Sequence, residues 1–403
     1  MKKNVLVLLL IAANFLSVKL SAQNWVKTDS VANGYVISLA INPVNGNMLA
    51  AVDGIGVFRS TSQGTGWTSV NSGLPNKLAK CIVYDSKGKA YAGLNGSGIY
   101  TTTDDGNSWN ESDTGMTNKS VLNVYIGNNG NIYAGTWFLG TIFMSADNGA
   151  TWSDIGPAGN DIHSIFVAGN GDLYAGTDHN GLYKSTNGGK KWSVVGISGV
   201  IVYSIISDKS GNLYAGATDG AYISTDNGNN WNKTTLNANL VRSLIVSKTG
   251  YLFAATSSGI FRSIDNGASW KDFSAGLNEL DLNTYCFALS SDDILYTGTL
   301  RNVYKANLPD GVNETLANNF ELKIYPQPAK EKVNFAMTLN SANYTTLLIY
   351  DVLGNCAGRL CNSFLGQGNY HFEFNPTGLP SGIYYYKLQC GTEIKSGEIV
   401  YMP

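Results

Sequence analysis

Ser145-Ala146-Asp147-Asn148-Gly149-Ala150-Thr151-Trp152 is one copy of a pattern, Ser/Thr-x-Asp-x-Gly-x-x-Trp, that recurs along the chain. We call this pattern the octapeptide. Its tryptophans belong to a series in which neighbours lie 39 to 43 residues apart. The series is Trp25, Trp67, Trp109, Trp152, Trp192, Trp231 and Trp270. A fixed period of this size indicates a repeat architecture, in which each unit buries its apolar face only against its neighbours.

The third octapeptide position is expected to be structural. It holds Asp104, Asp147, Asn187, Asp226 and Asp265 in five copies, and Ser62 in a degenerate sixth. A side-chain oxygen there can accept hydrogen bonds from backbone N–H groups of its turn, the glycine supplies a conformation that a Cβ disfavours, and the tryptophan fills the space beneath. A calcium loop is disfavoured, because each copy offers one or two carboxylates and no closing bidentate Glu.

Each period is typical of four antiparallel strands. The clearest repeat has expected strands at 162–168, 173–176, 181–185 and 192–195, separated by Gly/Asn turns and the octapeptide. The seventh unit has strands at 295–298 and 302–305 but no octapeptide, whereas residues 25–28 resemble an outermost strand with nothing before it. We therefore expect an all-β fold: a seven-bladed β-propeller over residues 24–306, closed by its N-terminal strand.

The octapeptide resembles the Asp-box, or BNR, repeat of sialidase-like β-propellers. This resemblance implies that the boxes lie on the face opposite the ligand site.

Composition excludes several functions. Charged residues make up 14% of the 403 residues and the net charge is −2 without a basic face, so nucleic-acid binding is not expected. The 5 cysteines and 3 histidines lack metal-ligand spacing, so neither a metal nor a cofactor is predicted. Cys81 and Cys286 are expected to be packed thiols. One disulfide among Cys356, Cys361 and Cys390 stays open.

Both ends of the chain indicate export. Residues 1–22 resemble a secretory signal peptide, in which the apolar core is too short to span a membrane, so no transmembrane segment is expected in the mature chain. Past Lys305 the period stops. Residues 307–319 are polar and are predicted to be a linker, and residues 320–403 are predicted to form a small β-sandwich domain. Its expected strands are 322–325, 333–337, 345–350, 369–374, 382–389 and 398–401.

The last domain resembles the C-terminal sorting domain of the Bacteroidetes type IX secretion system. The matching segments are Tyr325-Pro326-Gln327-Pro328-Ala329, Leu348-Ile349-Tyr350-Asp351-Val352-Leu353-Gly354 and Leu379-Pro380-Ser381-Gly382-Ile383-Tyr384. The resemblance implies passage through the periplasm, recognition by the type IX translocon, and a secreted or outer-membrane surface location. An immunoglobulin-like binding module is the alternative.

Aligning the first strands of the repeats places one residue of each at an equivalent position near the mouth of the funnel. These residues are Ile37, Lys80, Leu122, His163, Tyr203, Arg242 and Tyr285. Loops on the same face add Asp53, Trp137, Phe138, Asp178, His179, Asp219 and Arg301. We predict a binding or scaffold propeller for glycan or protein, with Lys80, Trp137, His163, Tyr203, Arg242 and Tyr285 as the ligand-binding residues. Unrelated rim residues, and burial of Trp137 with Phe138 inside a long loop, are the alternatives.

Catalysis is the alternative function. Sialidases of this superfamily clamp a carboxylate with three arginines, yet two of the four propeller arginines, Arg59 and Arg262, directly precede octapeptides on the other face. Similar boxes occur in xyloglucan-cleaving glycosidases, which implies a pair of carboxylates. Candidates for such a pair are Asp53, Asp178, Asp219, Glu279 and Asp281.

Overall fold

The computed structural model describes residues 25–178, 180–308, 320–339, 343–352, 354–390 and 393–402. The predicted signal peptide, His179 and most of the predicted linker lie outside these residues. The chain divides into two compact units, Met1–Asp310 and Gly311–Pro403. Each is described by itself.

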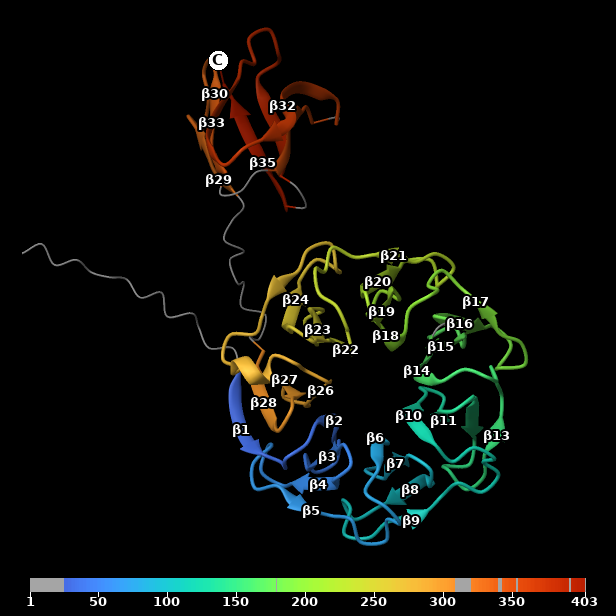
Figure 1. Cartoon of the computed structure of the whole chain (residues 1–403). Coiled ribbons are helices and arrows are strands. Elements are labelled where there is room, and N and C mark those ends of the chain that lie inside the picture. Colours follow the sequence, from blue (N-terminus) through green and yellow to red (C-terminus); the bar gives the residue numbers. More distant parts are fainter. Residues whose placement is uncertain are drawn as a thin grey trace, which may run out of the picture. The chain divides into compact units, whose positions relative to one another are not determined.

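The first unit contains seven four-stranded antiparallel sheets among its described residues, arranged in succession around a common centre (Figure 1). Four of them are β2 (Val36–Ile41), β3 (Met48–Val52), β4 (Gly56–Ser60), β5 (Thr68–Ser69); β6 (Ala79–Tyr84), β7 (Ala90–Leu94), β8 (Gly98–Thr102), β9 (Asn110–Glu111); β10 (Val121–Ile126), β11 (Ile132–Thr136), β12 (Ile142–Ser145), β13 (Ser153–Asp154); and β14 (Ile162–Val167), β15 (Leu173–Thr177), β16 (Leu182–Ser185), β17 (Ser193–Val194).

The remaining sheets complete the succession. They are β18 (Val202–Ser207), β19 (Leu213–Ala217), β20 (Gly220–Ser224), β21 (Asn232–Lys233); β22 (Ser243–Val246), β23 (Leu252–Thr256), β24 (Gly259–Ser263), β25 (Lys271–Asp272); and β26 (Cys286–Leu289), β27 (Ile294–Gly298), β28 (Asn302–Asn307) with β1 (Val26–Ser30). One 3₁₀ turn, η1 (Glu279–Asp281), precedes β26. No helix in the described part of the chain is long and apolar enough to cross a membrane.

Packing between neighbouring sheets explains the repeated Tyr-Ala-Gly in the second strands. Every residue of β11 and β15 is buried, because both faces of the sheet are covered by its neighbours. A Cβ added to Gly135 would lie 2.6 Å from Cγ2 of Ile162 in the next sheet, so only glycine fits there. The Tyr174 hydroxyl donates to the Asn227 carbonyl in the octapeptide of the next sheet, at 2.6 Å.

The octapeptide geometry follows from its residue types. Asp147 Oδ1 accepts hydrogen bonds from the Ser145 hydroxyl at 2.7 Å and the Thr151 amide at 2.9 Å. The Thr151 hydroxyl adds a third hydrogen bond, and these bonds hold the pKa of Asp147 at about 2. Trp152 reaches back to the preceding sheet and donates from Nε1 to the Ser112 carbonyl at 2.7 Å.

The sheet that contains β1 is assembled from both ends of the first unit. Val26 and Lys27 pair with Lys305 and Tyr304 of β28. Trp25 is fully buried, and its Nε1 donates to the Phe273 carbonyl of the preceding sheet at 2.7 Å. Trp25 thus makes the same kind of backward contact as Trp152.

The second unit has a three-stranded sheet facing a four-stranded one. The strands are β29 (Phe320–Tyr325), β30 (Val333–Leu339), β33 (Gly368–Phe374), and β32 (Cys356–Leu365), β31 (Asn343–Tyr350), β34 (Gly382–Cys390), β35 (Glu393–Tyr401). Phe335, Leu347 and Leu388 are among its fully buried core residues. The sequence did not predict β32, because this edge strand is mostly exposed and lacks a clear apolar alternation.

Two of the three cysteines of the second unit are outside any disulfide. Cys356 is an exposed free thiol and Cys361 a buried one, so neither contributes to the disulfide left open by the sequence. Cys81 and Cys286 are buried thiols whose pKa values burial raises to about 12.

Candidate functional site

The two faces of the propeller carry different parts of each sheet. Because the strands alternate in direction, the starts of the first strands and the loops between second and third strands lie on one face, which we call the upper face. The turns between first and second strands share the opposite, lower face with the octapeptides. The first strands lie nearest the common centre (Figure 1).

The structure brings the aligned first-strand residues together. A cavity of about 360 Å³, which we call the upper cavity, is lined by all seven of them. They are Ile37, Lys80, Leu122, His163, Tyr203, Arg242 and Tyr285. Cys81 and Cys286 also line this cavity, but their raised pKa values keep them protonated at neutral pH, which makes them unsuited as nucleophiles.

Aromatic side chains and Arg242 lie in an arc along one side of the upper cavity, as two groups of contacting residues. The rings of His163 and Tyr203 meet edge to face with centroids 5.3 Å apart. Arg242 lies over the Tyr285 ring, with Cζ 4.7 Å from the ring centroid. The Tyr285 ring packs against the Tyr35 ring, and their centroids are 5.2 Å apart. We call these five residues the aromatic arc.

The other side of the upper cavity is apolar or ion-paired. Ile37 and Leu122 offer aliphatic groups, and Lys80 Nζ lies 2.5 Å from Asp53 Oδ1. The charge of Lys80 is therefore balanced by that of Asp53. Arg242 differs from Lys80, because no described carboxylate forms an ion pair with it.

Burial sets the protonation states within the aromatic arc. Desolvation lowers the pKa of His163 below its ordinary value, although Asp161 and Asp178 oppose this, so the imidazole is neutral at pH 7. Desolvation likewise raises the pKa values of Tyr203 and Tyr285, with Arg242 opposing both shifts. Both phenols therefore keep their protons and can donate hydrogen bonds.

Three lining or supporting residues were not singled out from the sequence. Tyr35 and Asn283 stand two positions before the aligned residues of their strands, and Asn283 connects Arg242 to the Tyr285 hydroxyl. Asn123 occupies the following position, where the other repeats have Ser or Cys. Comparing the positions on either side of the aligned residue would have identified all three.

Trp137 and Phe138 lie apart from the upper cavity lining, in the loop between β11 and β12 on the upper face. Their rings are stacked with centroids 4.3 Å apart, and the Phe138 side chain is 64% exposed. Phe138 and Leu139 both have positive φ, near 57° and 55°, which is uncommon for bulky residues. The loop thus exposes Phe138 to solvent, with Trp137 half-buried against it.

Four of the five carboxylates proposed for a hydrolytic pair have other contacts. Asp53 pairs with Lys80, and Asp219 with Lys233 at 2.8 Å. Asp281 is buried and accepts hydrogen bonds from Thr299, in the loop before β28, and from Asn302 and Tyr304 of β28. Glu279 is exposed beside it. Asp178 also has a partner.

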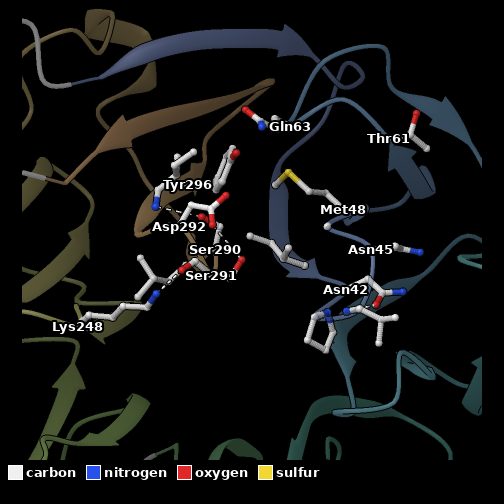
Figure 2. Close-up of a pocket in the computed structure, with 16 residues that line it drawn as sticks. Asn42, Asn45, Met48, Thr61, Gln63, Lys248, Ser290, Ser291, Asp292 and Tyr296 are labelled. Carbon is white, nitrogen blue, oxygen red and sulfur yellow. Dashed lines mark hydrogen bonds between the residues drawn. The ribbon is translucent and has the colours of Figure 1, made fainter. Parts of the chain in front are cut away.

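A second, larger cavity of about 710 Å³ lies on the lower face (Figure 2). Met48, Thr61 and Gln63 line one side of it and Lys248 with Ser290–Asp292 the other, as Figure 2 shows. Its polar groups are largely engaged already. Lys248 Nζ donates to the Ser291 carbonyl, and Asn42 Nδ2 donates to Asp105 Oδ1 at 2.7 Å. The upper cavity, with its convergent side chains, is therefore the stronger candidate site despite its smaller volume.

Metal binding finds no support in the described part of the chain, where no group of three or more His, Cys, Asp or Glu side chains could hold an ion.

Comparison with protein families divides the chain in the same way as its structure. Three overlapping segments, residues 91–200, 139–240 and 195–287, match the DUF6242 beta propeller domain, as expected when a repeat aligns in several registers. Residues 323–401 match the secretion system C-terminal sorting domain. The chain is a β-propeller joined to a type IX secretion sorting domain. It is therefore a secreted or outer-membrane surface protein.

Solved structures share the fold. The extracellular domain of the putative hybrid two-component system BT3049 from B. thetaiotaomicron is 14% identical, with TM-score 0.60, over 94% of this chain and 58% of that one. PorZ, from Porphyromonas gingivalis, is 15% identical with TM-score 0.55, over 93% and 60%. The chain thus spans about three fifths of both proteins.

A third similar structure is YCF48 bound to D1 peptide. It is 15% identical with TM-score 0.58, over 72% of this chain and 99% of that one. Identities this low show the fold alone. No curated protein matches the sequence.

Proposed function

We propose that this protein is a cell-surface binding module whose propeller takes a glycan into the upper cavity. The observation that carries the proposal is the aromatic arc, formed by residues from neighbouring sheets at one cavity. Aromatic faces, phenol hydroxyls and a neutral imidazole are suited to a ligand that is part apolar ring and part hydroxyl. The stacked rings of half-buried Trp137 and exposed Phe138 on the same face offer a second stacking surface for a longer chain.

The residues that line the upper cavity suit glycan binding better than glycan hydrolysis. Glycosidases of the common kind need two carboxyl groups on either side of the bond that is cleaved. Among the described residues that line the upper cavity, none is Asp or Glu. The larger cavity on the lower face has one carboxylate in its lining, that of Asp292.

The proposal includes a fold assignment finer than the family matches. We take the seven sheets to be the blades of an Asp-box propeller, with β1 as the outermost strand of the last. The pairing of β1 with β28 and the backward hydrogen bond of Trp25 support this arrangement. Edge pairing of this kind joins the two ends of the succession.

Two similar structures are relevant to this proposal. PorZ is described as an essential bacterial surface component of the type IX secretion system, and YCF48 was solved with a peptide. Fold does not imply function, so a peptide ligand remains an outcome to be tested.

The test is a glycan array combined with a polysaccharide-hydrolysis screen on the full chain. We expect binding without release of reducing ends, and loss of binding in Tyr203→Ala. A matched control, Tyr344→Ala, removes an exposed tyrosine of the second unit and should bind normally. Hydrolysis that is abolished by an upper-face Asp substitution, or binding to peptides but no glycan, would overturn the proposal.

A further inference from the structure

We infer that the ligand of the upper cavity is an acidic glycan and that Arg242 binds its carboxylate. This inference rests on the proposed glycan-binding function and names the class of sugar, one that carries a carboxylate beside its hydroxyls.

Arg242 is held in place through one edge of its guanidinium. Nη1 donates to Asn283 Oδ1 at 2.7 Å and to the Thr284 carbonyl at 3.4 Å, while the group stacks on Tyr285. Among the described residues, nothing accepts a hydrogen bond from Nη2 or Nε. This free edge is a rigid planar fork, which matches the two oxygens of a carboxylate.

The charge of Arg242 is also uncompensated. Its two acceptors are neutral, and no carboxylate in the described part of the chain forms an ion pair with it. Another basic side chain of the cavity lining, Lys80, already pairs with Asp53. A half-buried guanidinium without a counter-ion is favourably paired with an anion, because the surroundings screen its charge less than bulk water does.

Other groups that line the upper cavity favour a sugar acid over an acidic peptide. Asn123 Oδ1 is shielded from solvent and has no donor, so it suits a ligand hydroxyl. The Tyr203 hydroxyl and the His163 ring nitrogens have no hydrogen-bond partner among the described residues. A carboxylate bound at Arg242, in a cavity that also offers donors and acceptors, fits a uronic acid better than a Glu side chain, which carries no hydroxyls.

The experiment measures affinity by calorimetry and on an array with the full chain. The array presents carboxylate-bearing oligosaccharides, each beside its methyl ester, together with neutral oligosaccharides and an oligoglutamate. We expect at least one acidic glycan to bind about 10- to 100-fold more tightly than its ester. Arg242→Gln should reduce that affinity to the level of the ester, whereas Arg359→Gln, an exposed arginine of the second unit, should change nothing.

The outcomes separate this inference from the function on which it rests. Equal affinity for acid and ester, with binding still lost in Tyr203→Ala, would overturn the acidic ligand and leave glycan binding intact. Binding of neutral glycans alone would do the same. Preference for oligoglutamate would favour a peptide instead. If no glycan binds at all, the proposed function fails and this inference with it.

Discussion

Asp29 Oδ2 accepts a hydrogen bond from the Gly66 amide at 2.8 Å. Gly66 holds the position in its octapeptide that Thr151 holds in another, where the amide donates to Asp147. Ser62 replaces the aspartate in the degenerate copy, and its side chain makes no such bond. The N-terminal strand β1 therefore supplies the carboxylate from a neighbouring sheet.

β1 is therefore hydrogen-bonded both to its own sheet and to the octapeptide of the sheet β2–β5. It pairs with β28 through its backbone, and Asp29 also donates its own amide to the Gly64 carbonyl at 3.3 Å. The degenerate octapeptide thus contacts the same strand that pairs with β28.

Asp29→Ala should lower the free energy of unfolding by roughly 1 kcal/mol, since an amide loses its acceptor. Adding Ser62→Asp to that variant should restore most of the loss, because the octapeptide then has its own carboxylate. Urea denaturation of the single and double variants measures both effects. Additive losses without rescue would show that Asp29 does not replace the octapeptide aspartate.

Removing residues 24–30 should be far more damaging. The deletion exposes the edge of β28 and removes the buried Trp25, for which a cost of about 3–5 kcal/mol is expected from the side chain alone. Trp25→Ala separates the side chain from the strand pairing. A deleted chain that melts at the same temperature as the intact one would contradict closure of the propeller by β1.

The octapeptide carboxylates should make the free energy of unfolding depend on pH in the acidic range. Hydrogen bonds from the Asn230 amides, with a further one from Ser224, hold the pKa of Asp226 at about 2, against about 3.9 in an unfolded chain. Its contribution is therefore complete above about pH 4 and is lost as pH falls towards 2. Melting temperatures of wild type and Asp226→Asn should converge over that window.

Asn187, which occupies the aspartate position of its octapeptide, indicates how much Asp226→Asn and Asp226→Ala should each lower the melting temperature. Its Oδ1 accepts from the Ser185 hydroxyl at 3.0 Å and the Lys191 amide at 2.9 Å, as the aspartates do in their copies. Asp226→Asn should therefore be milder at neutral pH than Asp226→Ala, and ligand binding should survive in both. Equal melting temperatures for the two variants would mean that the acceptor itself contributes nothing.

Deleting residues 320–403 in the native host should leave the propeller in the periplasm, because the deletion removes the segment that matches the sorting domain. Cell fractionation and surface proteolysis measure its location. A chain that restores residues 320–403 should return to the surface or medium. Unchanged display of the truncated chain would contradict the role of this domain in export.

Much of the propeller could be predicted because, in a repeat protein, the position of a residue within its repeat also fixes its place in the whole fold. The Tyr-Ala-Gly strands and the octapeptides recur at one period, so equivalent residues must lie at equivalent radii around the common centre. Alignment alone therefore brings Ile37 and Tyr285, far apart in the sequence, to the same cavity. The edge strand β32 was missed because its exposed surface leaves no periodic apolar signal.

The sequence by itself determined the period, the four-stranded unit, the structural role of the octapeptide and the sorting domain, because each depends on short-range pattern. Tertiary structure alone decided which side chains of different sheets interact. Arg242 meets Asn283, 41 positions away, and Asp29 completes an octapeptide 37 positions away. Such contacts depend on the side-chain directions of neighbouring sheets, and no local periodicity encodes those directions.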